Sequence, residues 1–268
     1  MKIRSMPCRF EHFSTDWYRN WAGKLGYPVA DRPSHAIRKW WEYAAIAHAL
    51  DERGQLKPKK RGIGFAVGRE PLASLFAARG VSVLATDLHA GLGDAQWAES
   101  GQHAAALNDI WAGDTICPRR DFDRLVKFQP MDMNDLPEGD QSFDFAWSSC
   151  AFEHLGSLAH GTAFVKNAMR FLRPGGVAVH TTEFNVGSNS DTVTTGGAVI
   201  YRRCDLEELE RSLRVMRYGM EHPEFDCGTH EYDLVYDEPP FFTSGKPHVK
   251  LLQDGHICTS FVIIVHAA

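Results

Sequence analysis

Short apolar segments with strand character alternate with helical segments from residue 62 to residue 182, and this alternation leaves few folds open. The expected strands are residues 62–67, 81–86, 125–129, 143–148 and 177–182. The clearest helices between them begin near Pro71 and near Gly161. Strands that alternate with helices form right-handed β-α-β units, and such units build a parallel sheet. The pattern predicts an α/β fold with a mostly parallel sheet and helices on both faces.

The two ends of the chain fall outside this alternation. Residues 1–60 look mainly helical, and we expect them to form an N-terminal cap or lid on a domain formed by residues 61–268. Residues 184–204 are rich in Gly, Ser, Thr and Asn, which predicts a substrate-facing loop insertion. Late strands at residues 232–236 and 257–265 are expected to close the sheet as a C-terminal antiparallel hairpin.

Composition narrows the class of partner. The chain has 268 residues, 44% hydrophobic, with 29 basic against 34 acidic side chains, so it lacks the basic excess of a general nucleic-acid binder. Its six cysteines are scattered without a C-x-x-C pair, which favours reduced thiols. No apolar run approaches the roughly 20 residues of a membrane span, and the N-terminus is not a secretory signal. We expect a cytoplasmic protein that acts on a small molecule or a glycan; the oligomeric state stays open.

Three features fall where open parallel sheets bind ligands, beyond the carboxyl ends of their strands. The turn after residue 64 has small residues at Gly64, Ala66 and Gly68, which let a ligand approach the backbone closely. Asp87 closes the second strand and can accept hydrogen bonds from both hydroxyls of a ribose. Asp132 follows the third strand, where an acid can accept from an adenine amino group while Met133 packs on the ring.

Residues 62–182 resemble the class I S-adenosylmethionine-dependent methyltransferases, in particular those of bacterial glycan and secondary-metabolite pathways. The matching stretches are GFAVGREPLASLFAARGVSVLATDL, FQPMDMNDLPEGDQSFDFAWSSCAFEHL and FLRPGGVAVHTTE. The resemblance implies a Rossmann-like sheet of seven strands and S-adenosyl-L-methionine as the cofactor. It also implies cofactor contacts, which are Gly64, Ala66 and Gly68 to the methionine part, Asp87 and Leu88 to the ribose, Asp132 and Met133 to the adenine, and Ser148 and Ser149 to the sulfonium.

The turn departs from the pattern of this family, which has an acid in the first strand and a G-x-G-x-G turn. Gly64 stands at the acid position, and Glu70 either supplies an acid near the cofactor's ammonium group or caps the next helix. A dinucleotide-binding dehydrogenase would need G-x-G-x-x-G, and no register of this turn keeps all three glycines. An α/β domain without a nucleoside ligand is the remaining alternative.

Candidate catalytic residues lie at or after the strand ends. His154 is the first choice as a general base, and the alternative is a histidine that caps the next helix or packs beneath the cofactor. Glu183 either orients a substrate hydroxyl or holds the 184–204 loop. His230 and Asp226 can join Glu183 as ligands of a divalent metal, but the spacing matches no metal motif, so no metal site is predicted.

We therefore expect methyl transfer to oxygen, with a sugar-containing acceptor as the first choice. The loop at residues 184–204, with many hydroxyl and amide side chains, suits a hydroxylated acceptor, although a surface loop without a role would also be polar. Methyl transfer to nitrogen or carbon of a natural product is the second reading. A non-catalytic, cofactor-binding regulatory subunit is the third.

Overall fold

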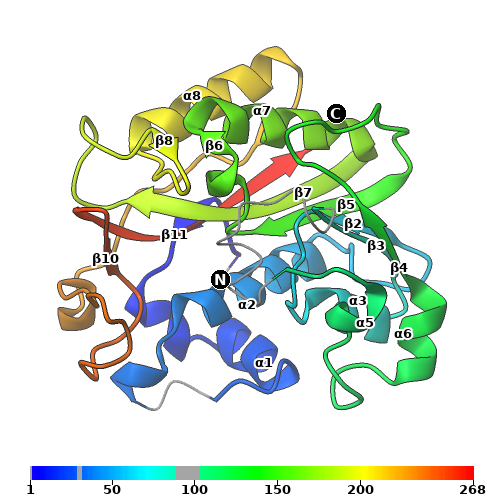
Figure 1. Cartoon of the computed structure of the whole chain (residues 1–268), viewed down its shortest axis with the longest axis horizontal. Coiled ribbons are helices and arrows are strands. Elements are labelled where there is room, and N and C mark those ends of the chain that lie inside the picture. Colours follow the sequence, from blue (N-terminus) through cyan, green and yellow to red (C-terminus); the bar gives the residue numbers. More distant parts are fainter. Residues whose placement is uncertain (1, 29–31, 89–102) are drawn as a thin grey trace.

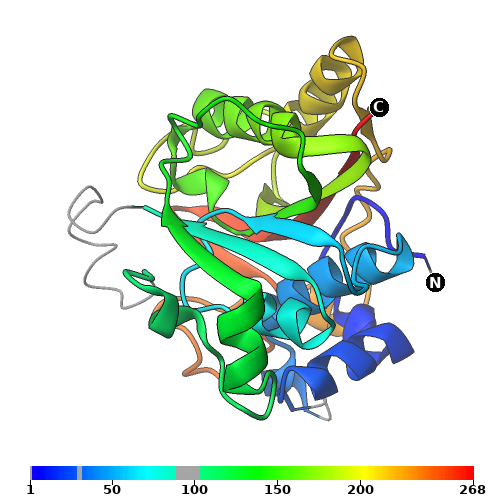
Figure 2. The ribbon, with the colours of Figure 1, turned by 90° about the vertical axis from the view of Figure 1, so that its right-hand side faces the viewer.

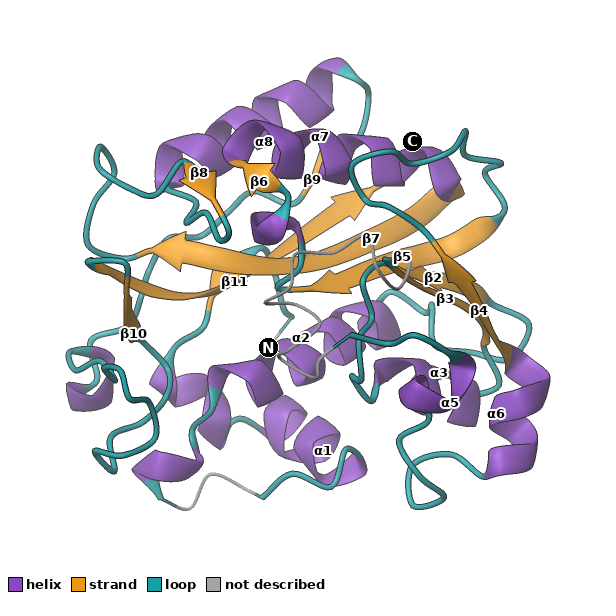
Figure 3. Ribbon diagram, in the orientation of Figure 1, coloured by secondary structure: helices purple, strands orange, loops and turns teal. Residues whose placement is uncertain are grey.

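A computed structural model describes residues 2–28, 32–88 and 103–268, and one central sheet lies between two layers of helices (Figures 1 and 3). The strands of this sheet are β1 (Met6–Pro7), β2 (Arg61–Gly64), β3 (Ser82–Asp87), β4 (Val126–Pro130), β5 (Phe143–Ser149), β7 (Leu172–Asn185), β9 (Gly219–Met220), β10 (Leu251–Gln253) and β11 (His256–His266). A separate short ladder pairs β6 (Gly156–Ser157) with β8 (Thr195–Gly196).

Helices cover both faces of the sheet. The α-helices are α1 (Asp16–Lys24), α2 (Arg38–Glu52), α3 (Leu72–Ala78), α5 (Leu107–Ile110), α6 (Arg119–Leu125), α7 (Leu158–Ala168) and α8 (Arg203–Val215). The 3-10 helices are η1 (Phe10–Ser14), η2 (Pro33–His35), η3 (Phe152–His154), η4 (Met169–Phe171) and η5 (Glu231–Asp233). Helices α7 and α8 lie on one face, and α1, α2, α3, α5 and α6 lie on the other (Figures 1 and 2). No helix in the described ranges is both long and apolar enough to span a membrane.

The sheet has the predicted mixed arrangement. Its strand order is β1-β11-β7-β5-β2-β3-β4, with β9 and β10 paired to β11. Strands β4, β3, β2, β5 and β7 run parallel, and β11 is antiparallel to β7. The chain therefore builds outward from β2 in one direction and returns to its other side with β5. Such a reversal of strand order is where ligands bind in open α/β sheets, and it places the site beyond the carboxyl ends of β2 and β5.

Two glycines of β2 let the large rings of β5 pack across the sheet. A Cβ at Gly62 would lie 2.3 Å from Cζ of Phe145, and a Cβ at Gly64 would lie 2.3 Å from Cζ2 of Trp147. Both distances are far shorter than a carbon–carbon contact, so only glycine fits at either position. The two rings lie edge-on to Phe76 of α3, which fixes this helix against the strands.

The C-terminal hairpin uses a different first strand from the one expected. The predicted strand at residues 232–236 is wrong, because the His230 side chain accepts a hydrogen bond from Tyr232 N at 3.2 Å and caps η5 there. Buried Asp233 then accepts from Phe10 N at 2.9 Å, which turns the chain away from the sheet. Instead β10 forms the hairpin with β11.

The N-terminal segment is tied into the sheet. Strand β1 pairs with β11, and Arg53 at the end of α2 donates to Glu221 next to β9 at 2.6 Å. In helix α2 the side chains of Trp41, Ala45 and Ile46 are fully buried on the face of the sheet that also carries α1 and α3 (Figure 1). The expected helix in residues 1–60 is confirmed at Arg38–Glu52, and Arg38 in its first turn donates to Glu183 of β7 and to Ser260 of β11.

Candidate active site

The turn after β2 is bent tightly against the end of β3. Ala66 and Gly68 have positive φ angles of 47° and 52°. A residue with a Cβ, such as Ala66, rarely adopts this left-handed conformation. Val67 N donates to Thr86 O at 3.0 Å, and Gly68 N donates to the Asp87 carboxylate at 3.0 Å. These bonds keep the turn's small residues at the carboxyl edge of the sheet.

Asp87 is the buried acid that organises this edge. Besides Gly68 N, its carboxylate accepts from Leu88 N at 2.8 Å and Ala104 N at 3.0 Å, and His103 Nδ1 lies 3.3 Å away. The side chain is 8% exposed. A carboxylate offers about four acceptor positions, so a ligand hydroxyl that binds Asp87 shares or replaces the contacts from residues 103 and 104.

The end of β4 lies beside the end of β3. Met131 N donates to Asp87 O at 2.8 Å, which brings the predicted adenine contacts next to the predicted ribose contact. Met133 is buried, whereas Asp132 is exposed and accepts from Asn134 N at 2.8 Å. One oxygen of Asp132 therefore fixes its own turn.

Glu70 is buried at the sheet instead of capping α3. Trp147 Nε1 donates to Glu70 Oε1 at 2.5 Å, and the N-cap of α3 is Pro71. Burial raises the pKa of Glu70 to about 8, despite the hydrogen bond from Trp147. Of the two roles predicted for Glu70, the capping of α3 is therefore not the one that the structure shows.

The two serines that end β5 point to different partners. Ser148 Oγ bonds to His180 Nδ1 of β7 at 2.8 Å and is fully buried. Ser149 Oγ donates to Glu42 Oε2 of α2 at 3.0 Å. Ser149 therefore contacts the helix that covers the carboxyl edge, and Ser148 contacts the neighbouring strand.

Glu42 collects hydrogen bonds from four elements. Lys39 Nζ donates to its Oε2 at 2.8 Å, and Thr181 Oγ1 of β7 donates to the same oxygen at 3.2 Å. Ser260 Oγ of β11 donates to Oε1 at 2.6 Å. Burial raises the pKa of Glu42, but the charges of Lys39 and Arg38 and the hydrogen bonds from Lys39 and Ser260 hold it below its usual range. With the bond from Ser149, a fixed carboxylate joins α2 to three strands.

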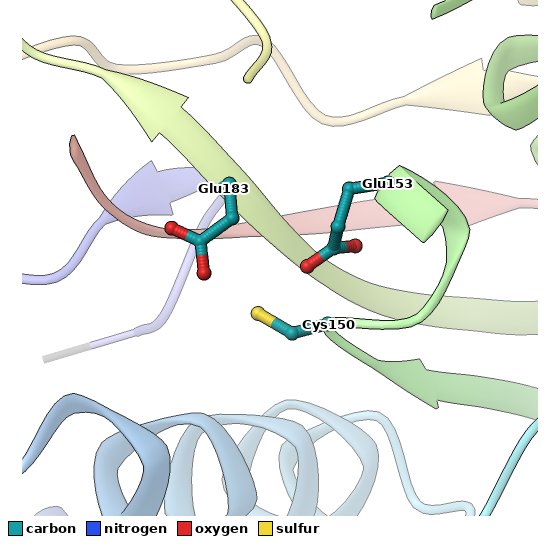
Figure 4. Close-up of side chains that lie close together, drawn as sticks. All are labelled: Cys150, Glu153 and Glu183. Atoms are coloured by element: carbon teal, nitrogen blue, oxygen red, sulfur yellow. The ribbon is translucent and has the colours of Figure 1, made fainter. Parts of the chain in front are cut away.

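Glu183 lies next to this network and is paired with α2 as well. Arg38 donates with both terminal nitrogens, at 2.7 Å to Oε2 and 2.5 Å to Oε1 of Glu183. Cys150 and Glu153 lie beside Glu183, and their ligand-type atoms are within 4.8 Å of one another (Figure 4). Burial, together with the charge of Glu183, raises the pKa of Glu153 to about 8. We call Arg38, Lys39, Glu42, Glu153 and Glu183 the acid–base cluster.

The family model "Methyltransferase domain" matches residues 63–180. These residues form a class I methyltransferase domain. The protein is accordingly a methyltransferase, its cofactor is S-adenosylmethionine, and the enzyme class and cofactor predicted from the sequence are confirmed. The sequence matches no curated protein.

Solved structures share the fold of this methyltransferase. An S-adenosylmethionine-dependent methyltransferase from Mesorhizobium loti aligns with a TM-score of 0.50 and 14% identity, over 87% of this chain and 99% of the other. A protein from Galdieria sulphuraria, assigned as a sarcosine dimethylglycine methyltransferase, aligns with a TM-score of 0.52 and 14% identity, over 86% of this chain and 84% of the other. At this identity the likeness shows the fold, and the predicted Rossmann-like sheet is confirmed.

In the methyltransferase, His154 ends η3 directly after Glu153. Its Nδ1 lies 2.7 Å from Gly197 O, and because a carbonyl only accepts, Nδ1 carries the proton and Nε2 does not. Burial lowers the pKa of His154, which keeps the ring neutral. Glu183 and Lys39 both act on it electrostatically, so His154 lies near the acid–base cluster.

The structure separates His230 from Glu183. The exposed His230 ring stacks on Phe10 at 4.7 Å, and Asp226 pairs with Arg9 at 2.5 Å. Among the described residues, the side chains that could bind a metal together with Glu183 are those of Cys150 and Glu153. The hypothesis that joined Glu183 to Asp226 or His230 is therefore not supported by their positions.

Sequence reasoning missed the contribution of α2. Arg38, Lys39 and Glu42 reach the strand ends from a helix that was expected only to cover the domain. One signal for them exists in the sequence: Glu42 is an acid inside the apolar run WWEYAAIAHAL, where an unpaired charge would be costly. Glu153 was passed over for the adjacent His154, since consecutive residues near a strand end gave no basis for choosing between them.

Proposed function

We propose that this methyltransferase moves the methyl group of S-adenosylmethionine to a hydroxyl group of a small polar molecule, with a sugar-containing acceptor as the first choice. His154 carries the proposal. Its bond to Gly197 O fixes the tautomer with the proton on Nδ1, and the ring lies near Glu183 at the carboxyl edge. A hydroxyl nucleophile must lose its proton during methyl transfer, and a neutral histidine is suited to take it.

The residues of the carboxyl edge fit the cofactor, which supplies a methyl group on a positively charged sulfur. Gly64, Ala66 and Gly68 line its methionine part, and Glu70 receives the ammonium group. Asp87 with Leu88 holds the ribose, Asp132 with Met133 holds the adenine, and Ser148 and Ser149 end the strand that faces the sulfonium. The buried Glu70 carboxyl supports this assignment, because a cation beside it would stabilise its ionised form.

Helix α2 supports the proposed cap role of residues 1–60. Its first two turns bring Arg38, Lys39 and Glu42 to the end of β5 and to the paired residues Glu183 of β7 and Ser260 of β11. Half-buried Trp40, also in the first turn of α2, stacks on Tyr27 with a distance of 5.0 Å between the ring centres. We assign this helix as the wall between the cofactor and the acceptor, where it excludes water from the reacting groups.

The 184–204 loop supports a hydroxylated acceptor less than its composition suggested. Asn185 Nδ2 donates to Asp191 O at 3.0 Å, and its Oδ1 accepts from Gly187 N at 3.0 Å. Ser188 Oγ accepts from Asp191 N at 2.9 Å. These polar groups make hydrogen bonds within the loop, so they are not the groups that we expect to bind the acceptor. The proposed acceptor class therefore rests on the acid–base cluster.

Calorimetric titration with S-adenosylhomocysteine tests the cofactor site. We expect the wild type to bind and Asp87→Asn to bind at least about 10-fold more weakly, a change of about 1.4 kcal/mol. Asp140→Asn, an exposed acid next to β5, should bind as the wild type does. A folded wild-type protein that does not bind would contradict the proposed site.

Transfer of a radiolabelled methyl group to sugars, other hydroxyl compounds and amines tests the reaction. His154→Ala should lose about 10²–10⁴-fold in rate while it keeps its affinity for S-adenosylhomocysteine. Transfer to amines alone would favour an N-methyltransferase. Cofactor binding without transfer to any compound would favour a non-catalytic subunit.

A further inference from the structure

Cys150, Glu153 and Glu183 converge from the end of β5, from η3 and from β7 (Figure 4). We propose that these three side chains bind one zinc ion at the acceptor side of the methyltransferase. Zinc lies about 2.0–2.3 Å from sulfur and oxygen ligands, so atoms around one ion are roughly 3–4 Å apart. The present separations, all within 4.8 Å, close to that range by small side-chain rotations.

One carboxyl oxygen of Glu153 is buried without a hydrogen-bond partner among the described residues. Its Oε2 accepts from Thr182 Oγ1 at 3.3 Å, while Oε1 has no hydrogen-bond partner in the described part of the chain. The residue is completely buried. Buried polar atoms in folded proteins are almost always satisfied, and an exception needs an explanation. A cation held between Glu153 and its neighbours satisfies this oxygen.

Cys150 holds an unusual backbone conformation at the same place. Its φ angle of 45° is one that residues with a Cβ seldom adopt, and its N–H donates to Thr181 O at 3.1 Å. Strained positions persist where the surrounding structure enforces them, and they gather at functional sites. Here the bend directs the thiol toward the two carboxylates (Figure 4).

The charges of the acid–base cluster match a divalent ion. Arg38 balances Glu183 and Lys39 balances Glu42. Glu153 has no ion-pair partner among the described residues, so a Glu153 carboxylate and a Cys150 thiolate together equal the charge of one divalent cation. Glu183 keeps its bond to Arg38 while it ligates, because each carboxylate oxygen has two lone pairs, and ligating carboxylates are commonly held in this way.

The ligand types select zinc over magnesium. Magnesium takes oxygen ligands in octahedral geometry, whereas zinc accepts thiolate and carboxylate together. Three protein ligands leave a fourth position open, as in catalytic zinc sites. If the proposed function holds, the acceptor hydroxyl takes that position, and the ion lowers its pKa so that its proton passes to His154.

Zinc titration of the chelator-treated full chain, followed by calorimetry and metal analysis, tests the site without cofactor or acceptor. We expect one zinc per chain. Changes to residues that only support the ligands lower metal affinity roughly 10–100-fold. Loss of a ligand itself, in Cys150→Ser or in Glu153→Gln, should therefore lower the zinc affinity at least about 100-fold. Cys204→Ser in α8 is the matched control and should bind as the wild type does.

Cobalt replacement adds a spectroscopic readout. A cobalt–thiolate charge-transfer band should appear with the wild type and with Cys204→Ser, and it should be absent with Cys150→Ser. Glu153→Gln decides the case if Cys150→Ser does not fold. Zinc binding that is absent from the wild type, or equal in the wild type and Cys150→Ser, overturns the proposal. Binding of S-adenosylhomocysteine by the same preparations shows separately whether the cofactor site has failed.

Discussion

Trp147 Nε1 donates to the Glu70 carboxylate at 2.5 Å, and the same indole ring occupies the space that a side chain at residue 64 would need. The two departures from the usual methyltransferase turn therefore have one cause. An acid cannot stand at residue 64 because Trp147 fills its place, and Trp147 in turn holds an acid that comes from the next helix start.

Glu70→Gln should stabilise the protein in mild alkali. Burial raises the pKa of Glu70 to about 8, so the folded state prefers the protonated form. This contribution to stability is complete below the unfolded pKa of about 4.5 and is lost as the pH rises through 8. Thermal unfolding of the cofactor-free protein should give Glu70→Gln a higher Tm than the wild type at pH 9 and a smaller difference at pH 6.

The exposed acid Asp140 gives a control, since Asp140→Asn should show no such trend. A Tm for Glu70→Gln that lies below the wild-type value by the same amount at every pH would show that Glu70 is ionised throughout.

Gly64→Ala should destabilise the sheet, because the new Cβ would lie 2.3 Å from Trp147 Cζ2 and 2.5 Å from Val67 Cγ1. Overpacking in a rigid core costs about 1–3 kcal/mol. Gly23→Ala is the opposite control. Nothing lies within 4 Å of its new Cβ, and alanine favours α1 by roughly 0.5–1 kcal/mol. Urea unfolding should move the two midpoints in opposite directions, and equal shifts would contradict the packing argument.

Glu42→Gln should weaken the joint between α2 and the strands. Breaking one partner of a buried ion pair costs about 3–5 kcal/mol, and the exposure of Lys39 reduces the expected loss to about 2–3 kcal/mol. The double variant Lys39→Met with Glu42→Leu removes both charges and should lose less than Glu42→Gln. Denaturant midpoints measure both, and a larger loss in the double variant would mean that Glu42 acts mainly through its serine and threonine donors.

Glu221→Gln should destabilise the protein at neutral pH but not in strong acid. Burial raises the pKa of Glu221, but hydrogen bonds from His266 and Arg53 lower it to about 2. The contribution is present above the unfolded pKa of about 4.5 and is lost as the pH falls through 2. The Tm difference between Glu221→Gln and the wild type should therefore shrink between pH 5 and pH 2. A constant difference over that range would assign the effect to packing.

The parallel sheet could be predicted from the sequence because it depends on local patterns. Gly64 and Asp87 end their strands and Asp132 lies two residues after one, and parallel strands bring their carboxyl ends together. The acid–base cluster depends on long-range contacts, which a local pattern does not contain. Nothing near Arg38 in the sequence indicates Glu183 as its partner, and the strand expected at residues 232–236 failed because Asp233 binds Phe10, 223 residues away.

The contact of Ser260 with Glu42 spans 218 residues of chain. Helix α2 is synthesised long before β11, the strand that carries Ser260. During synthesis the Glu42 carboxylate therefore lacks this donor until β11 has been made, and its set of hydrogen bonds is completed only then. Truncation before Ser260 would accordingly leave α2 without one of the bonds that join it to the sheet.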